Sequence, residues 1–155
     1  MDAHRCVAGR PLILGGVQLA ADFGLEAHSD GDVLTHAIMD ALLGAGNLGD
    51  KGTLFPASDP RYKGIRSLIL LEQVCARLAA RGCRIQNIDA TVACEEPKLA
   101  PHIPHMKREL SEVMHVSENA ISIKATTMER LGFTGRGEGI AALAVALVEC
   151  AQHDG

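Results

Sequence analysis

Three residues from two distant stretches have side chains that could form a catalytic zinc site. Asp2 and His4 are two positions apart, and on a strand residues with this spacing point to the same side. His36 adds a second imidazole from a stretch with helical periodicity. Two imidazoles and one carboxylate, with a fourth position open, hold zinc in enzymes where the metal acts on a substrate oxygen. The competing interpretation is a surface Asp-x-His pair on a fraying chain end and a hydrogen-bonded core histidine.

Two further carboxylates lie on the predicted helix face that carries His36. Asp32 and Asp40 are four residues before and four residues after it, so the three side chains form one row. A carboxylate commonly holds the free nitrogen of a metal-bound imidazole, and either residue could do so. The alternative is an ordinary solvated polar face.

A second group of candidates begins with Thr126, Thr127 and Glu129, and continues into the glycine-rich residues 133–139. Backbone amides at a helix start, together with two hydroxyl groups, form a natural phosphate site. A carboxylate beside it could hold magnesium, which prefers oxygen ligands. The alternative is a Thr-capped helix in which the glutamate completes a capping box.

A third candidate is the segment CEEPKLA at residues 94–100. Its proline stiffens the end of a predicted strand, so the backbone could present polar groups to a flat base, and Lys98 could meet a phosphate. The alternative is a simple turn into the following helix.

The elements that must position these residues follow from hydrophobic periodicity and from the glycine and proline positions. Residues 11–19 are predicted as a strand with a Gly-Gly kink, and Ser29 or Asp30 as the cap of the first helix. Residues 50–64 are predicted as a loop, and residues 140–149 fit either a strand or a buried helix. The remaining predictions are helices at 33–45, 68–80 and 103–113 and strands at 83–94 and 120–125. This order indicates a two-layer α/β sandwich.

Composition narrows the class of protein. The 155 residues suit one domain, 1–155, and the net charge of -4 with no basic run argues against nucleic-acid binding. The five cysteines form no CxxC pair and their number is odd. We therefore expect a protein of the reducing cytosol, without a disulfide framework. The N-terminal residues do not resemble a signal peptide, and the apolar runs are too short to span a membrane.

Taken together, the motifs resemble the 2-C-methyl-D-erythritol 2,4-cyclodiphosphate synthase family of the non-mevalonate isoprenoid pathway, over nearly the whole chain. The longest and most specific blocks are HSDGDV at 28–33 and GFTGRGEGIA at 132–141. The other matching stretches are PLILGGV at 11–17, HA and DALLGA within 36–45, LGD and LFP within 48–56, and PK and APHIP within 97–104.

The resemblance implies a ferredoxin-like fold, an α/β two-layer sandwich with helices on one face of a four- to five-stranded sheet. It also implies a cytoplasmic bacterial enzyme that forms a homotrimer with active sites at the subunit interfaces. The implied reaction is the cyclisation of 4-diphosphocytidyl-2-C-methyl-D-erythritol 2-phosphate with release of CMP, which is the work of a phosphorus-oxygen lyase. The implied cofactors are one Zn²⁺ per subunit and Mg²⁺ or Mn²⁺ with the substrate diphosphate.

Residue roles are implied position by position. The zinc ligands are Asp2, His4 and His36, the magnesium ligand is Glu129, and His28 and Thr127 stabilise the transition state. The implied substrate contacts are Asp2, His4, His28, Ser29, Asp50, Gly52, Phe55, Asp59, Cys94, Pro97, Lys98, Leu99, Ala100, Thr126, Thr127, Glu129, Phe133 and Arg136.

Two other functions stay open at this point. A diverged, non-catalytic trimeric binding protein would keep the fold and lose turnover. A zinc-dependent phosphohydrolase would release free phosphate or a ring-opened monophosphate instead of a cyclic product.

Overall fold

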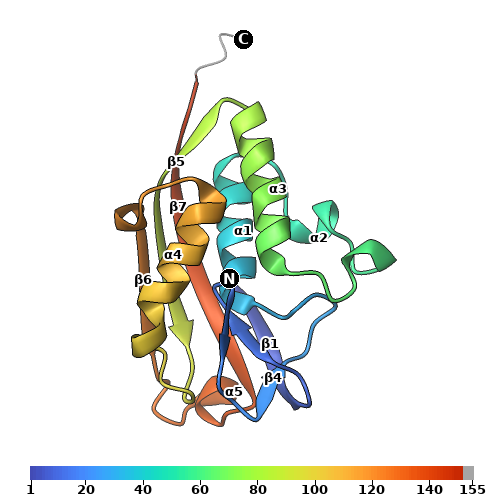
Figure 1. Cartoon of the computed structure of the whole chain (residues 1–155), viewed down its shortest axis with the longest axis vertical. Helices are drawn as coiled ribbons and strands as arrows, with labels where there is room; N and C mark the ends of the chain where they lie inside the picture. The colour runs from blue at the N-terminus through green and yellow to red at the C-terminus, as the bar shows by residue number, and fades with distance from the viewer. Residues whose placement is uncertain (152–155) are drawn as a thin grey trace.

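The computed structural model describes residues 1–151, so the last four residues of the expected domain 1–155 lie outside the described residues. Its main sheet has five strands in the order β4-β1-β7-β5-β6 (Figure 1). Only β5 and β6 pair in parallel, and α4 provides the crossover that such a pair requires. The five strands are β1 (Asp2–Ala8), β4 (Phe23–Leu25), β5 (Cys83–Ala93), β6 (Ile121–Thr126) and β7 (Gly139–Cys150).

Three long helices cover one face of this sheet, which confirms the expected two-layer ferredoxin-like arrangement (Figure 1). They are α1 (Val33–Ala45), α3 (Ser67–Ala80) and α4 (Ile103–Met114). The hydrophobic core lies between the layers, where fully buried side chains such as Leu34, Ile38 and Ile88 meet. Helix α1 packs along β7, so its polar face is held close to the strands beside β7.

The apolar stretch near the C-terminus, which fitted a strand or a buried helix, is the strand β7. Its side chains alternate, with Ala142 and Ala144 buried against the helices and Leu143 and Val145 exposed on the other face. This period of two is the pattern of a strand with two different environments. The face opposite the helices is therefore lined by apolar side chains.

The predicted strand at residues 11–19 is instead a hairpin of β2 (Leu12–Leu14) and β3 (Val17–Leu19). Gly15 and Gly16 form its turn with positive φ, and their N–H groups donate to the Asp32 carboxylate at 2.9 and 2.7 Å. The same carboxylate accepts from the N–H of Thr35, so Asp32 is the N-cap of α1. The prediction that Ser29 or Asp30 caps α1 is wrong, because both side chains have other partners.

The chain start is ordered into the sheet. Strand β1 begins at Asp2, which pairs with Ala142, and His4 pairs with Ile140. The expectation of a fraying end is wrong, because β7 pairs with residues 2–5 of this strand and β4 with residues 6–8.

The expected loop at residues 50–64 contains two short helical turns, α2 (Lys51–Leu54) and a 3₁₀ turn at Pro60–Tyr62. Two more 3₁₀ turns lie at Ala100–His102 and Glu118–Ala120, and α5 (Gly132–Gly135) is a single turn. Among the described residues, no helix is both long enough and apolar enough to cross a bilayer.

One disulfide contradicts the expectation drawn from the cysteine count. Cys83 at the start of β5 is bonded to Cys150 at the end of β7. The two residues are 67 positions apart and become neighbours only through the antiparallel register of these strands. The spacing of the cysteines in the sequence does not predict this pair.

Candidate metal and substrate site

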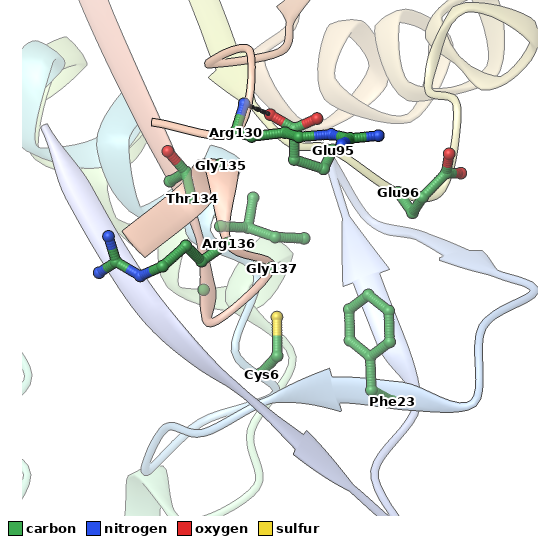
Figure 2. A pocket seen from close by; sticks show the side chains of 11 residues that line it. Cys6, Phe23, Glu95, Glu96, Arg130, Thr134, Gly135, Arg136 and Gly137 are labelled. Atoms are coloured by element: carbon green, nitrogen blue, oxygen red, sulfur yellow. Dashed lines mark hydrogen bonds between the residues drawn. The ribbon is translucent and has the colours of Figure 1, made fainter. Parts of the chain in front are cut away.

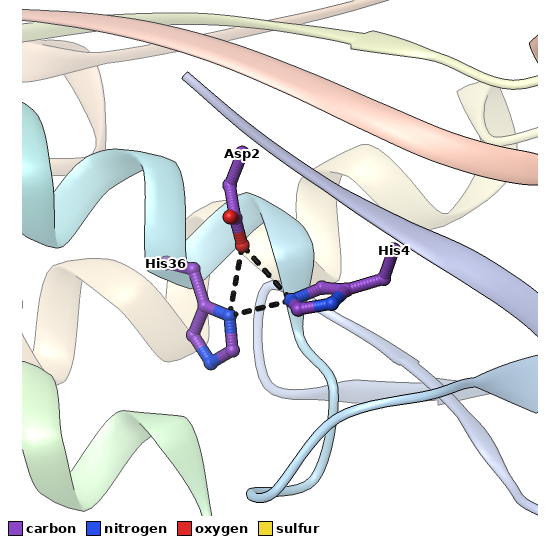
Figure 3. Close-up of side chains that lie close together, drawn as sticks. All are labelled: Asp2, His4 and His36. Carbon is purple, nitrogen blue, oxygen red and sulfur yellow. Dashed lines mark hydrogen bonds and ion pairs between the residues drawn. The ribbon is translucent and has the colours of Figure 1, made fainter. Parts of the chain in front are cut away.

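Asp2, His4 and His36 meet at one point between β1 and α1 (Figure 3). Asp2 Oδ2 lies 2.9 Å from His4 Nε2 and 3.0 Å from His36 Nδ1, and the two imidazole nitrogens are 3.0 Å apart. Ligand atoms of a tetrahedral zinc ion at about 2.0–2.1 Å are roughly 3.3 Å from one another. The three groups therefore fit a small tetrahedral cation after only slight separation.

The Asp2 carboxylate is held by a lysine that the sequence did not point to. Lys51 Nζ lies 3.2 Å from Asp2 Oδ1 and 3.0 Å from Asp40 Oδ2, so one ammonium group bridges two carboxylates. Burial works to raise the pKa of Asp2, but hydrogen bonds from His36 and His4 and the charge of Lys51 lower it far below its usual value. Asp2 is therefore ionised, which is the state that binds a metal.

His36 Nε2 points away from the metal site into a buried polar cluster. It lies 2.8 Å from Ser67 Oγ and 3.1 Å from Ser29 Oγ. Neither predicted partner orients this ring, because Asp32 caps α1 and Asp40 binds Lys51. The row of Asp32, His36 and Asp40 on one helix face does exist, but its members serve three different purposes.

A cavity of about 230 Å³ opens beside the three candidate ligands. It is lined by His4 and His36 together with four of the expected substrate residues, His28, Ser29, Gly52 and Phe55. Lys51 and Tyr62 also line it, and neither was predicted. An anionic substrate group in this cavity would meet imidazole, hydroxyl and ammonium donors next to the metal site.

Two other expected residues of this region stabilise its loops. Asp50 caps α2 by accepting from the N–H of Thr53 at 2.8 Å, and Asp59 accepts from the Arg61 guanidinium at 2.6 Å. The backbone carbonyl of Asp59 lies 3.2 Å from His28 Nε2. These carboxylates thus hold the walls of the cavity rather than lining it.

A second, smaller cavity of about 160 Å³ combines seven of the remaining expected residues. The segment after β5 and the end of β6 line it together. Its residues are Cys94, Pro97, Lys98, Leu99, Ala100, Ala125, Thr126 and Thr127. The proposed base-binding segment and the two threonines are therefore neighbours, although about 30 residues separate them in the chain.

Glu129 lies next to this cavity in a tight turn. Thr127 Oγ1 donates to Glu129 Oε1 at 2.7 Å, and Glu129 and Arg130 both have positive φ. The turn leads to α5, which begins only at Gly132 and has no side-chain cap. The capping-box interpretation of Thr126–Glu129 is therefore wrong, because Thr127 and Glu129 are bonded to each other and neither caps α5.

A larger cavity of about 490 Å³ lies elsewhere (Figure 2). Cys6, Phe23 and Glu96 line it, along with the glycine-rich turn that carries Arg136. In Figure 2 the Arg136 side chain points away from Cys6 and Phe23, and its guanidinium pairs with Glu138 at 2.8 Å. None of the three candidate metal ligands contributes to this cavity.

Phe133 borders two other hollows. One is shared with Met1, Thr126 and Met128, and the other with His4 and Glu138. The expected site residues of one chain are thus divided among separate hollows, and the cavities of His28 and of Lys98 share no lining residue.

Comparisons with known proteins agree with this geometry. A sequence model described as the YgbB family matches residues 1–149. The 2-C-methyl-D-erythritol 2,4-cyclodiphosphate synthase of Porphyromonas gingivalis is 59% identical over 147 residues, which are 95% of this chain and 91% of that protein.

Two solved structures are similar throughout the chain. A 2C-methyl-D-erythritol-2,4-cyclodiphosphate synthase in its CDP-bound form has a TM-score of 0.87 and 38% identity, covering 96% of both chains. The bifunctional IspDF of Campylobacter jejuni has a TM-score of 0.93 and 41% identity over 97% of this chain. The chain spans only 41% of the length of that bifunctional protein.

Proposed function

Because the chain belongs to the YgbB family, we propose that it catalyses the cyclisation of 4-diphosphocytidyl-2-C-methyl-D-erythritol 2-phosphate to the 2,4-cyclodiphosphate. The observation that carries this proposal is the convergence of Asp2, His4 and His36 beside the cavity of His28 and Ser29. It puts a candidate metal site next to anion-binding side chains, which a diphosphate substrate requires.

The reaction is a phosphoryl transfer within one molecule. An oxygen of the 2-phosphate forms a bond to the β-phosphorus of the cytidine diphosphate group, and the bond from that phosphorus to the bridging oxygen breaks. CMP leaves with the bridging oxygen and its electron pair, so the enzyme is a phosphorus-oxygen lyase. Catalysis of this kind depends mainly on positioning and on neutralising phosphate charge.

The candidate metal ligands suit zinc, and Glu129 suits magnesium or manganese bound with the diphosphate. When bound, such cations supply positive charge to the phosphate oxygens as the transition state forms. His28 lines the first cavity, where its imidazole stabilises the transferred phosphate, and its Nε2 lies 3.2 Å from the Asp59 carbonyl. Thr127 donates from the second cavity, where Lys98 and residues 94–100 hold the cytidine phosphate and base.

These two groups of residues complete one site only if two subunits combine them. The cavities share no lining residue, and a substrate with a cytidine at one end and a phosphate at the other needs both. The uncovered face of the sheet carries the exposed apolar side chains of Leu143, Val145 and Leu147. Such a patch is typical of a subunit interface. A homotrimer, with each site shared between neighbours, accounts for both observations.

The direct test is to incubate the protein with the substrate, Zn²⁺ and Mg²⁺ and to follow the products by phosphorus NMR. The proposal expects equal amounts of CMP and cyclic diphosphate, and one zinc per subunit by metal analysis. Free phosphate or a ring-opened monophosphate would identify a phosphohydrolase instead. A trimer that binds the substrate without releasing CMP would identify the non-catalytic binding protein.

A further inference from the structure

Ser67 connects a candidate metal ligand to a carboxylate that lies outside the metal site. It is the first residue of α3 and is completely buried. Its Oγ lies 2.8 Å from His36 Nε2 and 2.5 Å from Asp30 Oδ1. The three side chains come from α1, α3 and the loop before α1, so only the folded chain brings them together.

Hydrogen-bond geometry fixes where the protons lie. The Asp30 carboxylate accepts from Ser67 twice, from the backbone N–H at 2.8 Å and from the hydroxyl. A serine hydroxyl has one proton, so it offers only lone pairs to any other partner. The contact of 2.8 Å between Ser67 and His36 therefore requires that His36 Nε2 carries a proton and donates it.

We propose that Ser67, held by Asp30, is a positioning residue that keeps His36 in the tautomer ready for a metal. With a proton held on Nε2, Nδ1 is the nitrogen that can give its lone pair to a cation, and it faces Asp2 and His4. Without a cation, the Asp2 carboxylate at 3.0 Å favours a proton on Nδ1 instead, so Ser67 and Asp2 act on opposite nitrogens of one ring. Carboxylates commonly fix metal-binding imidazoles in this way, and here a hydroxyl group relays the effect. The inference rests on the metal site of the proposed function.

Ser29 does not perform the same task alone. Its Oγ lies 3.1 Å from His36 Nε2, and it accepts a long contact of 3.4 Å from the N–H of Gly31. No carboxylate accepts its hydroxyl proton in these contacts, so the hydroxyl can either donate to Nε2 or accept from it. Of the two serines, only Ser67 has the direction of its proton fixed by a charge, so Ser67 rather than Ser29 keeps a proton on Nε2.

The first test is the zinc affinity of purified, metal-free protein, measured by competition with a chromophoric chelator. Ser67→Ala is expected to bind zinc about 10–100-fold more weakly than the unmodified protein. Ser67→Thr, which keeps the hydroxyl, is expected to restore most of that loss. Ser111→Ala is the matched control, because it removes another buried serine hydroxyl whose partner is the Arg108 carbonyl on α4.

A change in zinc affinity caused by Ser67→Ala can be separated from a loss of folding. Ser67→Ala keeps the backbone N–H that donates to Asp30, so the start of α3 is retained, and thermal unfolding of each variant checks this. Asp30→Asn is a second variant, which removes the charge that orients the hydroxyl while keeping the shape. It is expected to weaken zinc binding in the same direction.

The second test reads the tautomer without any metal. In nitrogen-15 NMR of the metal-free protein at pH 8, the His36 ring is identified by its absence in His36→Gln. Nε2 is expected to carry a proton in the unmodified protein, and in Ser67→Ala the Asp2 carboxylate is expected to draw the proton of the neutral ring to Nδ1. If zinc affinity or the protonated nitrogen is unchanged in Ser67→Ala, the proposal is overturned.

Neither measurement uses substrate or turnover. Failure of Ser67→Ala to change them would leave the synthase activity of the unmodified protein untouched. Failure of the unmodified protein to form the cyclic product would overturn the proposed function and would leave the NMR result standing.

Discussion

The Nδ1 atom of His36 lies 3.0 Å from Oδ2 of Asp2, although the two residues are 34 positions apart. The contact joins the first turns of α1 to the start of β1, which β7 holds in place. The candidate metal site therefore forms only when the N-terminal strand is paired into the sheet. A bound cation should in turn hold this strand against the helix layer.

His36→Ala is expected to reduce zinc affinity at least 100-fold and to abolish turnover, because it removes one of three ligands. It should also destabilise the protein by about 1–3 kcal/mol, since Ser67 loses a buried partner. Metal analysis after dialysis, a turnover assay and thermal unfolding measure the three effects. His105→Ala, an exposed histidine paired with Glu109, is the control. Unchanged zinc occupancy in His36→Ala would contradict the ligand assignment.

The sequence predicted those parts of this site that depend on local patterns of residue type and spacing. The helix at 33–45 follows from its apolar spacing, and the three candidate ligands follow from residue type and strand and helix geometry. Lys51, Ser67 and Asp30 could not be found in this way. Each is an ordinary polar residue near a turn, and its role depends on contacts across more than ten positions of the chain.

The predictions from sequence that were wrong have a common physical origin. A Gly-Gly pair allows a kinked strand or a hairpin. The Asp32 carboxylate stabilises the hairpin by accepting hydrogen bonds from the N–H groups of Gly15 and Gly16. Cys83 and Cys150 are bonded because of sheet register, which cysteine spacing does not contain. In each case a partner distant in sequence selects one of several locally allowed structures.

Lys51→Met is expected to destabilise the metal-free protein by about 2–3 kcal/mol, because it leaves the carboxylates of Asp2 and Asp40 close together without their shared cation. Zinc binding should narrow this difference, since the metal neutralises Asp2 in place of the ammonium group. Chemical denaturation with and without zinc measures both quantities. Lys51→Arg keeps the charge and should stay close to the unmodified protein. A loss of stability that zinc leaves unchanged would argue against the shared-cation role.

Lys98→Ala is expected to weaken CDP binding about 10–100-fold, as the loss of a charge-assisted hydrogen bond to phosphate would. The side chain is exposed and reaches only the Glu95 carbonyl and Glu96, so it is free to turn to a ligand, and its removal should not affect folding. Isothermal titration calorimetry with CDP measures the change. Lys107→Ala, on α4 in the helix layer, is a control for general loss of charge. Equal affinities of Lys98→Ala and the unmodified protein would remove Lys98 from the nucleotide site.

The cysteine in the same cavity is expected to be unreactive. Burial, reinforced by Cys6 and Glu96, raises the pKa of the Cys94 thiol to about 12, and burial raises that of Cys75 to about 12. At pH 8 their thiolate fractions should be roughly a thousandfold below that of a free cysteine, increasing about tenfold with each pH unit. Mass spectrometry after brief iodoacetamide treatment measures the labelling of each residue, and the denatured protein is the reference. Rapid labelling of Cys94 in the folded protein at pH 8 would contradict this environment.

The open sheet face should control assembly and activity together. Val145 lies between Leu143 and Leu147 on that face and is 58% exposed in the single chain. Val145→Asp is expected to convert the proposed trimer to monomers, because burying the carboxylate at each contact costs several kcal/mol. Turnover should fall with the molar mass measured by light scattering, since a separated chain keeps the cavities of His28 and Lys98 apart. Ile69→Asp, which puts the same charge on the outer side of α3, should leave the trimer intact. A fully active monomer would show that one chain completes the site alone, and the two cavities would then have to be joined by movement within it.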